Sequence, residues 1–296
     1  MTAYHHGSLA VQDRVGVRDA AAHVGRSIGP GIKPVAAAFL ELQPMLVLAA
    51  AAPDGRMWTS LLTGAPGFVR ATGPHTVSVA VEDASHPARD LPAGTPVGTI
   101  ALDPRTRRRM RLNGIASPSP RGLTVEAERV FANCPKYLQK RELLDPAPVT
   151  PAAAPAARRT PHLTPDQRAF LRAADTFFIG TGTADGVDAS HRGGNPGFVR
   201  VASPSELTWQ DYPGNAMFLT LGNLERDPRT GLLFLDWETG TTLQLTGTAR
   251  TDYTDTGRTT RFAVDEVVET PAASPLRWSP PSYSPVNPPV PQGTQQ

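Results

Sequence analysis

Short hydrophobic stretches with alternating polar positions recur along the whole chain, separated by glycine, proline and Asp-Gly turns. In the first half they fall at residues 45–52, 76–81, 97–102, 109–115 and 123–130. In the second half they fall at residues 176–182, 206–209, 230–235, 241–248 and 260–268. Alternation with a period of two, bounded by turn residues, is typical of antiparallel β-strands. The pattern therefore predicts a mostly β protein, with one short helix starting at Pro34 and another at Pro165.

The sequence contains an internal repeat. Residues 64–70 read GAPGFVR, and residues 194–200 read GNPGFVR, 130 positions later. The segments that follow recur in the same order: DPRT at 103–106 and 227–230, then MRLNGIA at 110–116 and LQLTGTA at 243–249. A repeat of this length indicates one folding unit that occurs twice. About six strands in each unit, without a strand-helix-strand rhythm, favour a small antiparallel barrel.

The repeat divides the chain into four segments. Residues 1–145 are predicted to form the first repeat with an N-terminal extension, and residues 165–288 the second repeat with a C-terminal docking segment. Residues 146–164 are rich in proline and alanine, which disfavours a strand ladder and predicts a linker. Aromatic residues between the C-terminal prolines predict that this stretch docks as far as residue 288, leaving 289–296 as a disordered tail.

Charge and composition exclude several classes of protein. Of 296 residues, 29 are basic and 27 acidic, and the formal charge of +2 does not require a polyanionic partner such as nucleic acid. The densest basic run, residues 105–111, alternates with Met110 and Leu112, which predicts a strand with a charged outer face. The single cysteine, Cys134, excludes an intramolecular disulfide. The longest apolar run is far shorter than the ~20 residues of a membrane span, so we expect a cytoplasmic protein without a membrane partner.

The richest polar cluster lies directly before the repeated Phe-Val-Arg motif. Ser190, His191, Arg192 and Gly193 combine a guanidinium, which binds phosphate or carboxylate oxygens, with glycine backbone that approaches an anion closely. For such a cluster in isolation, an ordinary hairpin loop with incidental polar residues is the favoured explanation. The first repeat, however, has Ser-Leu-Leu-Thr at residues 60–63, so the additional polar groups belong to the second repeat alone. This asymmetry favours a ligand site, although drift after duplication produces the same difference.

Three further segments carry candidate ligand-binding groups. Residues 209–218 offer Tyr212, Gly214 and Asn215 beside a Pro-Gly turn, and a turn with buried aromatics is the alternative. Gln244 lies in an alternating strand, where it points either into a barrel or into water. Residues 131–138 contain Lys136, which either reaches an anionic ligand or caps a sheet end, and Cys134, for which an inert role is favoured over nucleophilic catalysis.

The histidines and cysteine do not form a metal-ligand pattern, and the chain lacks the Walker, Rossmann and Gly-x-Ser-x-Gly motifs. Hydrolase and nucleotide-hydrolysing functions therefore lose support. The seven histidines are His5, His6, His23, His75, His86, His162 and His191.

Five motifs in the second half together resemble the flavin-binding split barrel of the pyridoxamine-phosphate-oxidase-like proteins. They read RGGNPGFVR at 192–200, DYPGN at 211–215, TLGNL at 220–224, DPRTGLLF at 227–234 and LQLTG at 243–247. FANCPKY at 131–137 is similar to the tandem bacterial members of the family. The resemblance implies two tandem six-stranded antiparallel split barrels that form a pseudo-dimer and hold FMN in a groove between them. Both a monomer and a homodimer fit this arrangement.

The resemblance also assigns the candidate residues. It places Ser190, His191, Arg192 and Gly193 near the flavin phosphate and ribityl chain, and Tyr212, Gly214 and Asn215 on the phosphate loop. That loop lacks the Ser-Arg-Lys run of the pyridoxamine oxidases proper, which argues against pyridoxamine phosphate as the substrate. Phosphate neutralisation then falls on Arg192, helped by Lys136 or Arg277, and Gln244 and Trp278 complete the set expected to bind the cofactor.

The resemblance implies an FMN-dependent oxidoreductase that acts on a small organic substrate, with NADH, NADPH or oxygen as the redox partner, since the flavin carries the chemistry. Residues for catalysis are not predicted, and neither is a metal. Two other classes stay open: a carrier or sensor that holds flavin, deazaflavin or haem without turnover, and a scaffold that has lost its cofactor.

Overall fold

The computed structural model describes residues 3–83, 86–144 and 156–290. The first half begins with three helices, α1 (His6–Arg14), α2 (Arg18–Gly25) and α3 (Pro34–Glu41). Seven strands and a short 3-10 helix follow: β1 (Met45–Ala51), β2 (Met57–Thr63), β3 (Val69–Ala71), β4 (Thr76–Ala80), η1 (Pro87–Asp90), β5 (Thr95–Asp103), β6 (Arg108–Ser119) and β7 (Gly122–Ala132).

The second half repeats this plan. Its helices are α4 (Pro165–Ala173) and α5 (Leu219–Leu224). Its strands are β10 (Thr176–Thr183), β11 (Gly186–Gly193), β12 (Val199–Ser203), β13 (Glu206–Gln210), β14 (Arg229–Leu235), β15 (Thr242–Thr254) and β16 (Gly257–Thr270). Three short strands lie outside the repeat: β8 (Leu143–Leu144), β9 (Arg158–Thr160) and β17 (Arg277–Trp278).

The strand order is the same in both halves. The first sheet runs β2-β1-β5-β6-β7-β4-β3, and the second runs β11-β10-β14-β15-β16-β13-β12, with antiparallel pairing throughout. Each path has two free ends, so each sheet is split rather than closed into a continuous ring. The predicted fold class, mostly β with two tandem antiparallel split barrels, is confirmed. Each path also includes a short edge strand, β3 or β12, in addition to the six expected strands.

Local sequence signals explain how the repeat's helices begin. Pro34 and Pro165 occupy first-turn positions, where the missing amide hydrogen has no intrahelical partner to lose. In α4 the Thr164 hydroxyl accepts from the Gln167 amide, and the Gln167 side chain accepts from the Thr164 amide. This reciprocal capping box satisfies two backbone donors that the helix leaves unpaired.

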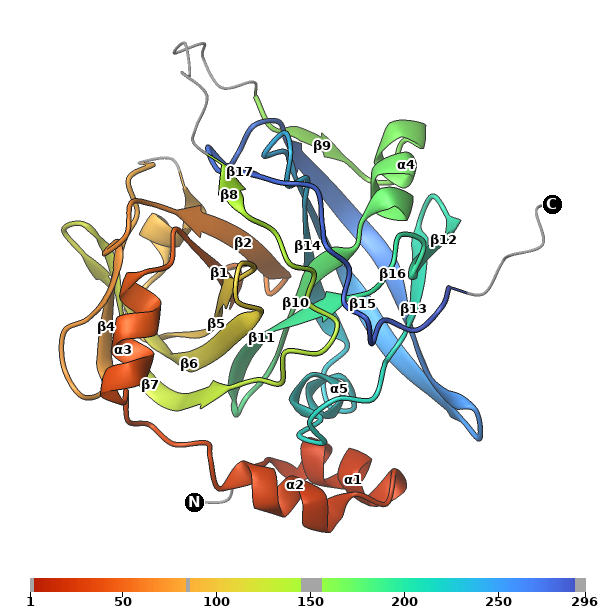
Figure 1. The fold of residues 1–296 in the computed structure, drawn as a ribbon, viewed down its shortest axis with the longest axis horizontal. Helices are drawn as coiled ribbons and strands as arrows, with labels where there is room; N and C mark the ends of the chain where they lie inside the picture. Colours follow the sequence, from red (N-terminus) through yellow and green to blue (C-terminus); the bar gives the residue numbers. More distant parts are fainter. Residues whose placement is uncertain (1–2, 84–85, 145–155, 291–296) are drawn as a thin grey trace.

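The two halves lie side by side and share a third hydrophobic core (Figure 1). Each half has its own core, and a further cluster joins β1, β2 and β5 of the first half to β10, β11 and β14 of the second. Gly98 and Gly231, equivalent positions 133 residues apart, allow this close approach. A Cβ on Gly98 would lie 2.5 Å from the Ala189 nitrogen, and one on Gly231 would lie 2.8 Å from the Met57 carbonyl oxygen. The contact is therefore built on backbone proximity as well as on side chains.

The N-terminal helices belong structurally to the second half as well as the first. Helices α1 and α2 lie beside α5 in Figure 1, and a small hydrophobic cluster joins Tyr4 and Ala21 to Met217 and Leu219. The Gln12 side-chain amide donates to the Met217 carbonyl at 3.0 Å. The extension thus braces the segment that leads into α5.

Parts of the predicted linker and tail are ordered. Residues 145–155 and 291–296 lie outside the described residues. Within the predicted linker, however, β9 pairs with β16. Its three residues lie between prolines rather than containing one, so their amides remain available for the ladder. The C-terminal segment contacts both halves. The Ser284 amide donates to the Gln139 side chain of the first half at 2.8 Å, and Val290 packs against the hydrophobic core of the second half.

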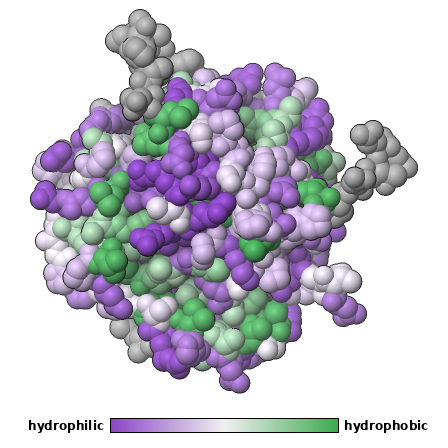
Figure 2. Space-filling view, viewed as in Figure 1, coloured by the Kyte–Doolittle hydropathy of each residue, from purple (hydrophilic) through white to green (hydrophobic). Residues whose placement is uncertain are grey.

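Hydrophilic residues cover most of the face shown in Figure 2, with hydrophobic residues in separate small groups. Scattered apolar residues of this kind are normal on a protein surface. Among the described residues, the helices are all too short or too polar to cross a bilayer.

Candidate functional site

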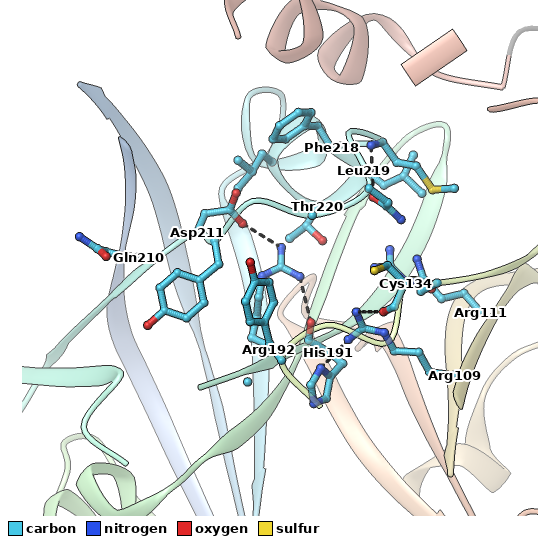
Figure 3. Close-up of a pocket in the computed structure, with 18 of the residues that line it drawn as sticks. Arg109, Arg111, Cys134, His191, Arg192, Gln210, Asp211, Phe218, Leu219 and Thr220 are labelled. Carbon is cyan, nitrogen blue, oxygen red and sulfur yellow. Dashed lines mark hydrogen bonds and ion pairs between the residues drawn. The ribbon is translucent and has the colours of Figure 1, made fainter. Parts of the chain in front are cut away.

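A pocket lined by arginines lies where the two halves meet (Figure 3). The first half contributes β6, through Arg109 and Arg111, and the segment after β7, through Asn133, Cys134 and Tyr137. The second half contributes the end of β11 and the segment 210–221 that leads into α5. The enclosed space is about 100 Å³. We call this the cationic pocket.

Arg109 and Arg111 correct one expectation from the sequence. The strand β6 begins only at Arg108, because residues 104–107 form a turn, and it places the Arg109 and Arg111 side chains on one face. That face is not in water, because it packs against β11 of the second half, and Arg111 is only 9% exposed. A charged strand face therefore faces the other repeat instead of the solvent.

A buried ion pair anchors Arg111. Its Nη1 donates to Asp188 Oδ2 at 2.9 Å, and its Nη2 donates to Ser190 Oγ at 2.6 Å. The Asn113 side-chain amide donates to the other Asp188 oxygen at 2.9 Å. These bonds cross from β6 to β11, so the same network joins the halves and fixes Arg111 at the edge of the pocket.

Arg192 shares Ser190 with Arg111. Its Nη1 donates to Ser190 Oγ at 2.7 Å, and its Nη2 lies 3.5 Å from Asp211 Oδ1. Asp211 also accepts from Arg258 Nε at 3.0 Å. Burial lowers the pKa of the Arg192 guanidinium, while Asp211 acts in the opposite direction. The Asp211 carboxylate thus pairs with both Arg192 and Arg258.

His191 is buried and neutral. Its Nδ1 accepts from Arg109 Nη1 at 2.6 Å, and since a guanidinium only donates, the ring hydrogen must be on Nε2. Burial, reinforced by Arg109, Arg192 and Arg111, lowers the pKa of His191 well below its ordinary value. The Nε2 hydrogen is therefore a fixed donor, and it has no acceptor among the described residues.

The pocket carries more positive than negative charge. Around it stand four arginines, Arg109, Arg111, Arg192 and Arg258, and two carboxylates, Asp188 and Asp211. Burial, Arg111 and Arg192 lower the pKa of Arg109 to about 9, which shows the cost of holding these cations together. A surplus of two positive charges in a partly dry site favours an anion with about two negative charges.

Several polar atoms around the pocket have no partner in the part of the chain that the structure describes. They are the Nε atoms of Arg109, Arg111 and Arg192, the His191 Nε2, and both amide atoms of Asn133. Buried polar groups normally have partners, so a cluster of unpaired ones marks the place of a ligand or water. Asn133 offers a donor and an acceptor side by side, which suits a ligand amide or imide edge.

Two tyrosines from different halves border the pocket. The rings of Tyr137 and Tyr212 lie 5.2 Å apart between centroids, and the Tyr137 hydroxyl donates to the Pro213 carbonyl at 2.9 Å. Gly193 allows the Tyr137 backbone to cross β11, because a Cβ there would lie 2.0 Å from the Tyr137 carbonyl oxygen. Both tyrosines are partly exposed, which gives a planar ligand an aromatic border.

The structure brings together most, but not all, of the residues predicted from the sequence. His191, Arg192, Gly193, Tyr212, Gly214 and Asn215 line the pocket, and Ser190 lies directly behind it. Lys136 is exposed, with only its carbonyl oxygen near Arg109, at 3.5 Å. Gln244 lines a different pocket. Arg277 bonds to the Ser274 carbonyl, and Trp278 packs against Trp237.

Sequence reasoning did not propose Arg109, Arg111, Asp188 and Asp211 as site residues. Arg111 and Asp188 are 77 residues apart, and neither belongs to a local motif that marks a site. The available signal was the unusual arginine density of residues 105–111. Of these arginines, Arg108, Arg109 and Arg111 lie on β6, and residues 241–248 in the equivalent region of the second half carry no arginine. The arginines are thus present in the first repeat alone, just as the additional polar groups at residues 190–193 are present in the second repeat alone.

Fold and site together define a duplicated antiparallel β protein with a cationic pocket between its two halves. Residues 163–286 match the model of the family described as pyridoxamine 5'-phosphate oxidase. This match confirms, for the second half of the chain, the resemblance to the pyridoxamine 5'-phosphate oxidase-like proteins seen in the motifs. No curated protein matches the sequence.

Solved structures similar to the chain each cover little more than one third of it. A HupZ variant from Group A Streptococcus is 12% identical, with a TM-score of 0.30, over 36% of this chain and 98% of its own. An FAD-binding protein from Mesorhizobium loti is 11% identical, with a TM-score of 0.30, over 40% and 99%. A protein related to general stress protein 26 from Clostridium acetobutylicum is 11% identical, with a TM-score of 0.27, over 38% and 91%.

Proposed function

We propose that the chain is a flavoprotein whose cationic pocket holds the phosphate end of FMN. The observation that carries this proposal is the surplus of two positive charges beside buried polar atoms that have no partner. A phosphate monoester carries about −1.5 to −2 charges near pH 7, which balances that surplus. The match of residues 163–286 to the pyridoxamine 5'-phosphate oxidase family model supports the same ligand.

The size of the pocket limits which part of the cofactor it encloses. Small-molecule sites usually measure roughly 300–1,000 Å³, whereas this enclosed space is about 100 Å³. The pocket therefore fits a phosphate group, and the ring system would extend toward the partly exposed border of Tyr137 and Tyr212. In this arrangement Arg192, Arg109 and the His191 Nε2 hydrogen would hold the phosphate, and the amide of Asn133 would bind a further polar group.

We further propose that the protein is an FMN-dependent oxidoreductase acting on a small organic molecule, with a nicotinamide or oxygen as the redox partner. Bound FMN supplies hydride or electron transfer, and the protein supplies binding, orientation and electrostatics. Because two halves of one chain already form the pocket, we propose that a single chain suffices for one flavin. His191 is kept neutral and bonded to Arg109, so it acts as a fixed donor rather than as an acid.

The alternative of a flavin, deazaflavin or haem carrier makes different predictions about the purified protein. Oxidised flavin absorbs at about 370 and 450 nm. Without oxygen, NADH or NADPH bleaches these bands only if the protein is a reductase. Unchanged bands after both donors would favour a carrier or an oxidase. A Soret band would favour haem, and failure to bind added FMN would favour a scaffold and contradict the proposal.

A matched ligand pair tests the phosphate assignment directly. Riboflavin and FMN differ only by the phosphate group, so their affinities isolate its contribution. Charge-assisted hydrogen bonds predict that FMN binds about 10- to 150-fold more tightly than riboflavin. Equal affinities, measured by fluorescence titration of the protein stripped of flavin, would show that the cationic pocket does not hold the phosphate.

A further inference from the structure

The pseudo-symmetry of the two halves gives the network of Arg111, Asp188 and Ser190 a counterpart elsewhere in the fold. Because the strand orders are identical, Ser190 on β11 corresponds to Ser60 on β2, 130 positions earlier. By the same alignment Asp188 corresponds to Trp58. On the facing strand, Arg111 corresponds to Gln244, 133 positions later. The equivalent site is thus formed by β2 of the first half and β15 of the second.

A second pocket lies beside the counterpart of this network. Its enclosed space is about 560 Å³, and it contains Trp58, Ser60 and Gln244. Leu48, Leu91 and Val268 contribute apolar surface from both halves. The volume is within the range of about 300–1,000 Å³ that is usual for small-molecule sites. This second pocket is larger than the cationic pocket and has a different chemistry.

Gln244 retains the contact between the halves but not the charge. Its Nε2 donates to Ser60 Oγ at 3.1 Å and to the Thr59 carbonyl at 2.9 Å. The first of these bonds corresponds to the one from Arg111 to Ser190. Both amide hydrogens of Gln244 are thus engaged, while its Oε1 accepts from none of the described residues. That oxygen is available to a ligand that donates an N–H or O–H group.

The charges around the second pocket do not favour an anion. Arg159 pairs with Glu266 at 2.6 Å, and Arg56 pairs with both Asp54 and Glu266. Asp90 also lines the pocket. Two arginines against three carboxylates leave no surplus of positive charge. Trp58 stands at the position equivalent to Asp188, so an aromatic ring takes the place of the buried carboxylate that pairs with Arg111.

We propose that the second pocket binds an uncharged, mostly apolar aromatic molecule that donates one hydrogen bond to Gln244 Oε1. Apolar lining favours burial of a hydrophobic ligand, and a few placed polar groups orient it. This site is independent of what occupies the cationic pocket. The protein thus has one pocket for an anion and one for a neutral aromatic compound.

A matched series of naphthalenes tests the proposal with the full chain. The probes are 2-naphthol, which is neutral and donates a hydrogen bond, 2-methoxynaphthalene, which is neutral and does not, and 2-naphthyl phosphate, which is anionic. One hydrogen bond predicts that 2-naphthol binds about 2- to 12-fold more tightly than 2-methoxynaphthalene. Binding is measured by fluorescence titration with the cationic pocket saturated by inorganic phosphate, and the phosphate ester should bind most weakly.

Two variants locate the binding. Gln244→Leu should remove the preference for 2-naphthol over 2-methoxynaphthalene, and Trp58→Asp should weaken both neutral probes at least about tenfold by placing a charge in an apolar site. Arg192→Ala is the control and should leave the binding of both probes unchanged. Thermal melting of each variant shows whether the fold is intact.

Three results would overturn the proposal: no saturable binding of either neutral probe, equal binding by wild type and Trp58→Asp, or a preference for 2-naphthol that persists in Gln244→Leu. None of them concerns flavin. The failure of this proposal is therefore distinguishable from the failure of the proposed FMN site.

Discussion

Arg111 of the first half donates to both carboxylate oxygens of Asp188 in the second half, at 3.3 and 2.9 Å. The side chains are 10% and 5% exposed, so this ion pair is buried between the two repeats. Arg111 also lines the cationic pocket, and Asp188 balances part of the charge there. Stability of the interface and the charge of the ligand site are consequently linked through one contact.

Asp188→Asn should destabilise the protein strongly. The substitution preserves shape but leaves Arg111 buried without its counterion, and removal of one partner from a buried pair typically costs about 3–5 kcal/mol. Asp252→Asn is the matched control, because its pair with Arg261 is exposed and worth at most about 1 kcal/mol. Urea denaturation of both variants measures the difference, and similar losses would contradict the assigned role of the buried pair.

Arg192→Ala should weaken the binding of FMN but not that of riboflavin. The lost guanidinium is predicted to reduce FMN affinity about 10- to 150-fold, as expected for a charged hydrogen bond to phosphate. Asp211 keeps Arg258 as its partner, so the fold should tolerate the change. Arg200→Ala, on the exposed position of the repeated motif, serves as the control. Flavin content that stays equal in both variants would refute the assignment.

Gly193→Ala should separate the halves at the pocket. The added Cβ would lie 2.0 Å from the Tyr137 carbonyl oxygen, so the backbone must move, at a cost of about 1–3 kcal/mol. Gly214→Ala is the matched control, since it lines the same pocket and its nearest neighbour would be 4.0 Å away. Thermal denaturation distinguishes the two. An unchanged melting temperature for Gly193→Ala would show that the crossing at Tyr137 is looser than described.

His191 should make the protein less stable in mild acid. Its pKa is lowered in the folded state, so below about pH 6.5 the unfolded chain takes up a proton that the folded chain does not. The free energy of unfolding therefore decreases as the pH is lowered. At pH 5 the loss from this residue reaches about 2 kcal/mol at most.

His191→Asn keeps an acceptor for Arg109 and removes the titration. The pKa values of His5 and His86 are also lowered and contribute with the same sign in both proteins. The slope between pH 7 and pH 5 should therefore become shallower in the variant, without vanishing. Denaturation at several pH values measures both slopes, and identical slopes would show that His191 titrates normally.

The periodic pattern and the repeat predicted the fold because both are local properties of a strand. Alternation in residues 109–115 and 243–247 placed the strands correctly, and the recurrence of GxPGFVR indicated that both halves share one plan. Thr164 and Pro165 likewise predicted the start of α4, since capping involves neighbours in sequence.

Alternation alone determined that Arg109 and Arg111 share a face, and the motif at residues 190–193 marked one wall of the site. Only the tertiary structure decided that this face meets β11, that Asp188 balances Arg111, and that Gln244 belongs to another pocket than Arg192. The physical reason is that a strand's period defines its two faces but not their surroundings. Those surroundings depend on how two separately folded sheets dock, which involves contacts between residues far apart in the chain.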